Sequence, residues 1–181
     1  KQPFTLDELD KIKTFCLEDH SIISLVCGLI FDTGCSFREI IGLINDDISL
    51  SRYNPYLVIR SNHYREINNI YKRRIIPLVG LSLETMGKIQ KASGKELLFK
   101  SYINKKKKYD YLEKKINSKL DHFYKGKTLI SFKFAIINRL KLINCPESVI
   151  CELIGLAKKQ SFYDEEVSLD TKSSWLSQIV I

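Results

Sequence analysis

Four side chains of this sequence could do chemistry on a phosphate ester if the fold brought them together. Tyr163 carries a phenol that could act as a nucleophile, and Arg38, Lys72 and Lys133 carry positive charges that could hold a developing negative charge. A phenol has an ordinary pKa of about 10, so such a nucleophile needs cations close to the ester. These four side chains can act together only if the helices and strands of the chain bring them to one place.

The stretch DTGCSFRE at 32–39 has two interpretations, one structural and one catalytic. Gly34 fits the end of one helix, and Ser36 fits the start of the next, with Glu39 three residues further on. This S-x-x-E arrangement explains the stretch by helix capping alone. The other interpretation is the remnant of an active-site turn.

The composition is that of one folded domain. The chain has 181 residues, of which 44% are hydrophobic and 28% charged, which suffices for a single domain over 1–181 with its own core. No apolar run approaches the roughly 20 residues of a membrane span, and the start lacks a signal-peptide pattern. Because the first residue is not methionine, we expect a C-terminal fragment of a longer chain.

The cysteines indicate a reducing compartment. There are five, and no two are spaced as CxxC, so neither a disulfide framework nor a zinc site is expected. We therefore predict buried thiols in a cytoplasmic protein. We expect no metal, no small-molecule cofactor and no membrane as a partner.

The net charge of +8 is unevenly distributed along the chain. Residues 1–50 carry four basic and nine acidic side chains, a net of −5, and residues 144–181 carry a net of −3. Between them, residues 51–74 reach +5 and residues 100–127 reach +7. A basic middle between acidic ends favours one polyanion-binding face, and a nucleic acid is the class of partner that this charge distribution indicates.

The hydrophobic pattern predicts helices on either side of a short β-rich region. Helices are expected over 5–18, 21–33, onward from 36, then 82–93, 107–124, 131–143, 146–156 and 169–179. Short β-rich runs at 48–52, 56–60 and 73–78 are separated by turn-prone residues. The predicted fold class is α+β and mostly α-helical, with helices around a small three-stranded antiparallel sheet.

The order of these elements and motifs resembles the catalytic domain of tyrosine recombinases, the phage integrases. That family shows Thr-Gly-x-Arg-x-x-Glu, a three-stranded sheet with a lysine in a strand turn, His-x-x-Arg, a Gly-His or Gly-Trp pair, and last a nucleophilic tyrosine. The matching stretches here are TGCSFREIIGL, the run 55–86, RLKLINCPESVICELIGL and SFYDEEVSLDTKSSWL. They span nearly the whole chain in the family's order, so the resemblance implies a tyrosine recombinase catalytic-domain-like fold.

The resemblance also implies a reaction that needs neither metal nor cofactor. In the family, a tyrosine attacks a DNA phosphodiester and stays linked to the phosphate. Arginines hold the charge of the phosphorane, and a lysine or histidine protonates the departing oxygen. The resemblance thereby implies site-specific DNA integration or recombination, with Tyr163 in the nucleophile's place and a homo-oligomer assembled on double-stranded DNA.

The first catalytic position of the family is replaced in this sequence. Ser36 stands where the family has its first arginine, and Glu39 is kept. Arg38 follows two residues later, and positions i and i+2 of a helix do not share a face. Arg38 therefore cannot simply take the arginine's place, whereas Ser36 is a good helix cap.

The later catalytic positions are replaced as well. Asn68 falls where the strand-turn lysine would stand, and Lys72 comes four residues late. His-x-x-Arg becomes ISFK at 130–133, so histidine is absent and Lys133 keeps the charge without the bidentate fork of arginine. The Gly-His or Gly-Trp pair becomes Gly-Leu within 155–157.

Two basic regions are candidates for contact with DNA phosphates. The candidate DNA-binding residues are Arg60, Arg65, Arg73 and Arg74 near the sheet, and Lys105, Lys106, Lys107 and Lys108 in a lysine run. The lysine run has a second interpretation, a solvated loop before a helix.

Three hypotheses follow. The first is a catalytically degenerate integrase domain that still binds duplex DNA. The second is an active strand transferase that uses Tyr163 with the shifted basic set Arg38, Lys72 and Lys133. The third is a helical protein-interaction module without DNA binding.

Overall fold

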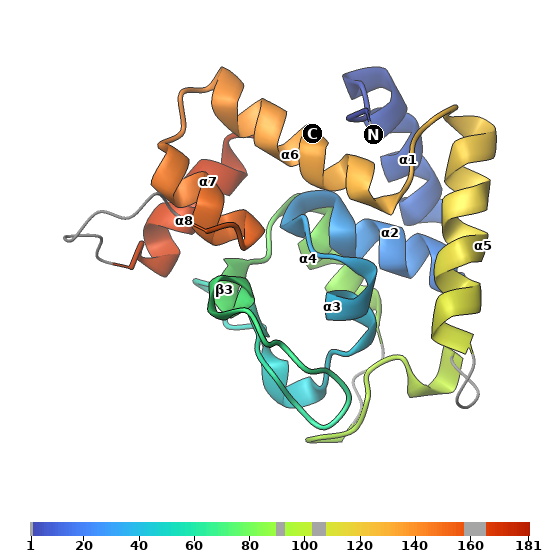
Figure 1. The fold of residues 1–181 in the computed structure, drawn as a ribbon, viewed down its shortest axis with the longest axis horizontal. Coiled ribbons are helices and arrows are strands. Elements are labelled where there is room, and N and C mark those ends of the chain that lie inside the picture. Colours follow the sequence, from blue (N-terminus) through green and yellow to red (C-terminus); the bar gives the residue numbers. More distant parts are fainter. Residues whose placement is uncertain (1, 90–92, 103–107, 158–165) are drawn as a thin grey trace.

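The computed structural model describes residues 2–89, 93–102, 108–157 and 166–181. Helices surround a small sheet, and α2 (Ile22–Thr33) runs through the middle of them (Figure 1). Eleven of the twelve residues of α2 are buried, and the helix packs against α1 (Leu6–Glu18), α3 (Phe37–Ile41), α4 (Gly80–Lys88) and α6 (Leu129–Leu142). A helix that is apolar on all sides can be stable only in such a position.

The caps of the N-terminal helices are those expected from the sequence. Thr5 and Glu8 form a capping box at the start of α1, with the Thr5 backbone N 2.8 Å from Glu8 Oε2. At the C-terminal end of α2, Gly34 adopts the left-handed conformation with φ of 61°. The predicted helix starts and the predicted stop at Gly34 are therefore confirmed.

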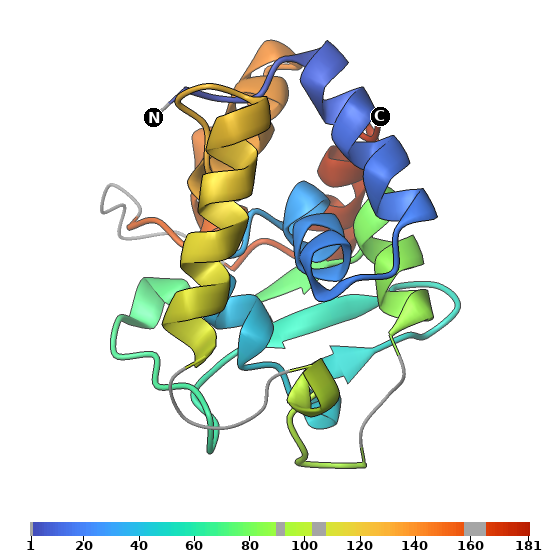
Figure 2. The ribbon, with the colours of Figure 1, turned by 90° about the vertical axis from the view of Figure 1, so that its right-hand side faces the viewer.

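The predicted three-stranded sheet is confirmed. Strands β1 (Ile48–Ser49), β2 (Tyr56–Ile59) and β3 (Arg74–Pro77) form an antiparallel sheet in the order β1-β2-β3. Leu57 and Ile76 are partners across the sheet and are both fully buried. Figure 2 shows the sheet beneath the helices, with α1 and α5 (Lys108–Phe123) on either side of α2.

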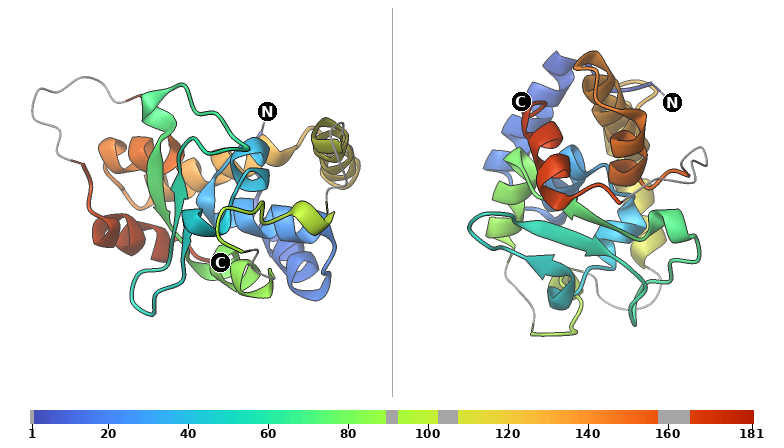
Figure 3. Two further views of the ribbon diagram at one scale, coloured as in Figure 1. Left: turned by 90° about the horizontal axis from the view of Figure 1, so that it is seen from below. Right: turned by 90° about the vertical axis from the view of Figure 1, so that its left-hand side faces the viewer.

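The C-terminal helices close the other side of the core. They are α5, α6, α7 (Glu147–Ile154) and α8 (Leu169–Ser177), which agree with the predicted ranges to within two residues at each described end. Helix α8 returns to pack against β3 (Figure 3). Among the described helices, none combines the length and the apolar character that crossing a bilayer requires.

Two local features differ from the predicted pattern. Helix α4 begins at Gly80 rather than Ser82, and its described part ends at Lys88. The early start has a tertiary cause, because the Ser82 backbone N donates to Asp32 Oδ2 (3.2 Å) at the end of α2. Single 3-10 turns at Asn45–Asp47 (η1), Ile70–Lys72 (η2) and Lys100–Tyr102 (η3) were not predicted, since one turn carries no hydrophobic period.

The predicted burial of the thiols is confirmed. All five cysteine side chains are buried. Burial, together with the adjacent Glu39 carboxylate, raises the pKa of the Cys35 thiol to about 11. These cysteines therefore behave as small apolar core residues.

Candidate active-site cavity and nucleic-acid interface

Helix α3 fixes the carboxylate of Glu39. The Ser36 backbone N donates to Glu39 Oε2 (2.7 Å), and Ser36 Oγ accepts from the Glu39 backbone N (3.4 Å). The capping explanation of the SFRE stretch is therefore confirmed. It does not account for the whole environment of Glu39, whose carboxylate has a second partner.

That second partner is Arg74 on β3. Arg74 Nη1 lies 2.7 Å from Glu39 Oε1, and Arg74 Nη2 lies 3.3 Å from Glu39 Oε2. The two side chains are 3% and 9% exposed, so this is a buried bidentate ion pair. Burial by itself would raise the pKa of Glu39, but the charge and hydrogen bonds of Arg74 outweigh it and hold the pKa below its usual value.

Lys133 on α6 faces the same charges. Its side chain is half-buried, and burial lowers its pKa. The nearby guanidinium of Arg74 lowers the pKa of Lys133 further, while Glu39 acts in the opposite direction. Lys133 is thus an ammonium group held in a partly desolvated, already positive place.

Glu39 and Lys133 line a cavity of about 510 Å³. It lies between α3, the segment before β3, α6 and the end of α7, and we call it the Lys133 cavity. Its lining includes the residues that stand at the family's catalytic positions, namely Ser36, Asn68, Ile130, Lys133 and Gly155. Residues that are up to 119 positions apart in the sequence therefore meet as the resemblance implies.

A glycine allows the close approach behind this cavity. A Cβ at Gly34 would lie 2.9 Å from Ile154 Cδ1 and 3.9 Å from Lys133 Cα. The turn between α2 and α3 can therefore sit directly against α6 and α7. This packing is what brings Ser36 and Lys133 to one cavity.

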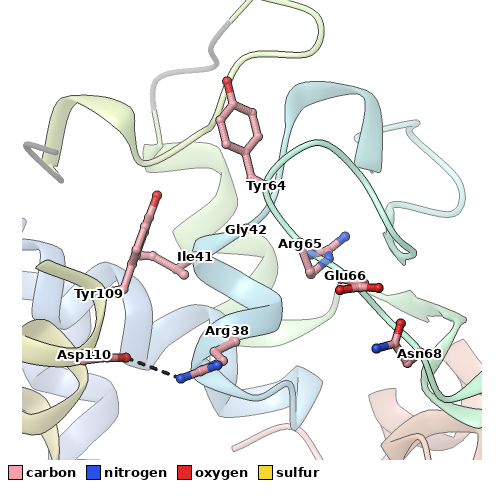
Figure 4. Close-up of a pocket in the computed structure, with 9 residues that line it drawn as sticks. All are labelled: Arg38, Ile41, Gly42, Tyr64, Arg65, Glu66, Asn68, Tyr109 and Asp110. Carbon is pink, nitrogen blue, oxygen red and sulfur yellow. Dashed lines mark hydrogen bonds and ion pairs between the residues drawn. The ribbon is translucent and has the colours of Figure 1, made fainter. Parts of the chain in front are cut away.

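The other members of the shifted basic set are more exposed. Lys72 and Arg38 also line the Lys133 cavity. The Arg38 side chain is 79% exposed, and its Nη2 lies 3.4 Å from Asp110 Oδ1 on α5. Figure 4 shows the Arg38 guanidinium directed toward Asp110. Tyr163, the candidate nucleophile, lies outside the described residues.

The candidate DNA-binding residues fall into an exposed and a buried group. Lys72 and Arg73 are exposed, and Arg60 has a side chain that is 49% exposed although it pairs with Asp47 (2.8 Å). Lys105, Lys106 and Lys107 lie outside the described residues, and Lys108 is the first residue of α5.

Arg65 and Arg74 form the buried group, and for them the expectation of a surface phosphate contact needs correction. Each side chain is 3% exposed. Arg65 Nη2 lies 3.1 Å from Asp47 Oδ2, and its Nη1 donates to the Glu39 carbonyl oxygen (2.5 Å). Because internal acceptors occupy both guanidinium groups, these two arginines are not part of the DNA surface proposed below.

Sequence reasoning missed the role of Asp47. Its side chain is fully buried and binds Arg60, Arg65 and the amide of Asn62 (2.9 Å). This carboxylate ties the 3-10 turn before the sheet to the segment that follows β2. An acidic pair directly before a strand is ordinary turn composition, so no signal in the sequence indicates that Asp47 is buried.

Solved structures of DNA-recombining proteins are similar to this chain. A Tn1549 transposon integrase in complex with a circular intermediate DNA matches with a TM-score of 0.62 and 13% identity, over 97% of this chain and 61% of that chain. XerH site-specific recombinase bound to difH substrate matches with a TM-score of 0.57 and 15% identity, over 97% of this chain and 50% of that chain. The chain has a tyrosine recombinase-like fold.

The comparison of structures shows the tyrosine recombinase-like fold, whereas comparisons of the whole sequence do not detect it. No protein-family model matches the sequence, and a search of curated proteins finds no significant relative. The chain spans between half and two thirds of the length of the recombinases that it resembles. A fold can host many functions, so the function must be argued from the Lys133 cavity and the charged surface.

Proposed function

We propose that this chain is a DNA-binding, tyrosine recombinase-like domain whose strand-cleavage chemistry is impaired. The observation that carries the proposal is the lining of the Lys133 cavity. Ser36, Asn68 and Ile130 occupy places that the family fills with arginine, lysine and histidine, and none of the three can carry a positive charge. DNA as the partner is supported by the structural neighbours, which are named as DNA complexes.

Most of the positive charge near the cavity is already committed. Arg74 donates to Glu39 and to the Leu153 carbonyl oxygen (3.0 Å), so its fork is not available to a phosphate. Lys133 supplies a point charge but no bidentate geometry. Each missing donor to a developing oxyanion costs on the order of a hundred- to a thousandfold in rate. Several missing donors therefore predict cleavage too slow to accumulate product.

Binding to DNA needs less than cleavage. Arg60, Lys72 and Arg73, together with the lysine run at 105–108, supply cations that can neutralise phosphates without reading sequence. Neutralising about six phosphates predicts a log–log slope of affinity against salt of about −5 on duplex DNA. Filter binding across salt concentrations measures that slope. A weak and flat response would instead support the helical interaction module without DNA binding.

A suicide DNA substrate tests the loss of cleavage directly. Such a substrate traps any 3′-phosphotyrosyl adduct, because the cleaved strand cannot be rejoined. We expect the wild-type chain and Tyr163→Phe to give the same background on denaturing gels. Rapid adduct formation by the wild type, mapped to Tyr163, would show that the chemistry is intact.

One observation favours the second hypothesis, an active strand transferase. Arg38, Lys72 and Lys133 all line the same cavity. On this hypothesis, Arg38 exchanges its exposed contact with Asp110 for the bound phosphate. Adduct formation by the wild type that is lost in both Arg38→Ala and Tyr163→Phe would establish it. That the chain assembles as a homo-oligomer on DNA remains a prediction. That it is a single domain of a longer chain also remains a prediction.

A further inference from the structure

A second hollow of about 510 Å³ shares part of its lining with the Lys133 cavity. Figure 4 shows the residues that line this second hollow. Its walls are Tyr64, from the turn after β2, and Tyr109, from the first turn of α5. Its floor is the end of α3 at Ile41 and Gly42. We call this hollow the Tyr64–Tyr109 pocket.

Hydrogen bonds fix the turn that carries the Tyr64 wall. Tyr64 lies in a tight turn in which the Asn62 backbone N donates to the Arg65 carbonyl oxygen (2.8 Å), and the Tyr64 backbone N donates to Asn62 Oδ1 (2.9 Å). The neighbouring Arg65 is the buried arginine that binds Asp47. The turn is therefore anchored to the core, while the Tyr64 side chain remains 47% exposed.

The Tyr109 wall is half-buried and faces the same space. Burial raises the pKa of Tyr109, and the Tyr64 phenol raises it further. The second effect requires the two phenols to lie close enough to interact electrostatically. In Figure 4 the Tyr64 and Tyr109 hydroxyl groups point in the same general direction.

The floor is apolar and the rim is polar. A Cβ at Gly42 would lie 2.9 Å from Arg65 Cβ, so the aliphatic stem of Arg65 lies directly on α3. The Arg38–Asp110 pair forms one edge of the pocket, and Glu66 forms part of another. Two aromatic faces, an apolar floor and a rim of donors and acceptors fit a planar heteroaromatic ring.

We propose that the Tyr64–Tyr109 pocket binds an unpaired base of a DNA strand whose backbone lies over the Lys133 cavity. This inference rests on the proposed DNA binding. The two hollows share Arg38, Arg65, Glu66 and Asn68 in their linings, so a phosphate in one and a base in the other can belong to neighbouring positions of the same strand. An aromatic side chain stacks on any base, so the pocket selects unpaired over paired bases and does not read sequence.

Duplexes that differ in one nucleotide test the pocket. A perfectly matched duplex is compared with the same duplex carrying a single extrahelical 5-iodouracil, at one fixed salt concentration. Loss of one stacking contact corresponds to about a 5- to 150-fold change in affinity. We expect the extrahelical duplex to bind about tenfold or more tightly than the matched one, and irradiation to crosslink its iodouracil to Tyr64 or Tyr109.

The variants separate stacking from folding. Tyr64→Leu should reduce the preference for the extrahelical base to less than twofold while binding matched duplex as the wild type does. Tyr64→Phe and Tyr109→Phe should keep the preference, because they keep the rings. Tyr111→Leu is the matched control, since Tyr111 is 66% exposed on α5 and two residues from Tyr109, on another face.

The possible failures are distinct. Salt-dependent binding of both duplexes with equal affinity, or a preference that Tyr64→Leu leaves intact, would overturn the base pocket and leave the proposed DNA binding standing. Failure to bind either duplex would overturn both proposals.

Discussion

The two carboxylates that bracket the turn from Asp32 to Glu39 are both buried, yet their pKa values move in opposite directions. Burial, offset only in part by the charge of Arg139, raises the pKa of Asp32 to about 6. Glu39 is also desolvated, but the direct contact with Arg74 holds its pKa below the usual value. Glu39 is paired with a guanidinium, whereas Asp32, seven residues earlier, accepts backbone amides at the start of α4.

This difference explains how Glu39 can be buried although no arginine stands at position 36. The family resemblance implies an arginine there, whereas this chain has Ser36. Glu39 would be an unpaired buried anion if nothing else served it. Arg74, which arrives from β3, supplies the missing counter-charge. The Glu39–Arg74 pair thus keeps this part of the cavity wall close to charge balance.

The largest expected effect comes from breaking the Glu39–Arg74 pair. Glu39→Ala leaves the buried Arg74 without its counter-charge, which should lower the free energy of unfolding by about 3–5 kcal/mol. Because the folded pKa of Glu39 is lowered, its stabilisation is present above its ordinary pKa of 4.5 and is lost as the pH falls through the folded value. Urea denaturation at pH 7 and at pH 3 measures both the loss and its decline.

The control for this variant is another glutamate beside the same cavity. Glu66 lines the Lys133 cavity but is exposed. Glu66→Ala should therefore change the free energy of unfolding by no more than about 0.5 kcal/mol. Equal losses in the two variants would mean that the buried ion pair is not what stabilises this wall.

A medium effect of opposite sign is expected at Asp32. Because its folded pKa is raised to about 6, from an ordinary value of 3.8, the folded state binds more protons than the unfolded state in that window. Stability should therefore fall as the pH rises from about 4 to about 6. Asp32→Asn should remove this loss, worth about 1–3 kcal/mol, as measured by urea denaturation across that range. A variant that keeps the wild-type pH dependence would contradict the assignment to Asp32.

The fold was largely predictable from the sequence because its signals are local. The capping boxes at Thr5 and Ser36, the stop at Gly34 and the β-rich runs each depend on neighbouring residues, and all are found in the structure. Where the prediction of α4 differs from the structure, a tertiary contact with Asp32 decides where the helix begins.

Motif order assigns Ser36, Asn68 and Lys133 to the family's catalytic positions, and the structure has all three in the lining of one cavity. Which basic side chains are exposed and which are paired could not be predicted. Counting basic residues could not separate Arg73, which is exposed, from its neighbour Arg74, whose side chain is 3% exposed. Alternation along a strand sends adjacent side chains to opposite faces. Which of the two meets a buried carboxylate depends on α3, 35 residues earlier in the chain.

The smallest expected effect comes from placing an arginine at position 36, where the family resemblance implies one and this chain has Ser36. Ser36→Arg removes the cap of α3, which should lower the free energy of unfolding by about 1 kcal/mol. It also adds a guanidinium at the rim of the Lys133 cavity, so the salt dependence of duplex binding should steepen by about 0.9 in the log–log slope. Ser36→Ala is the matched control, because it loses the same cap and adds no charge. If Ser36→Arg binds DNA no differently from Ser36→Ala, the Lys133 cavity does not lie on the DNA path, and the charge balance at Glu39 matters only for folding.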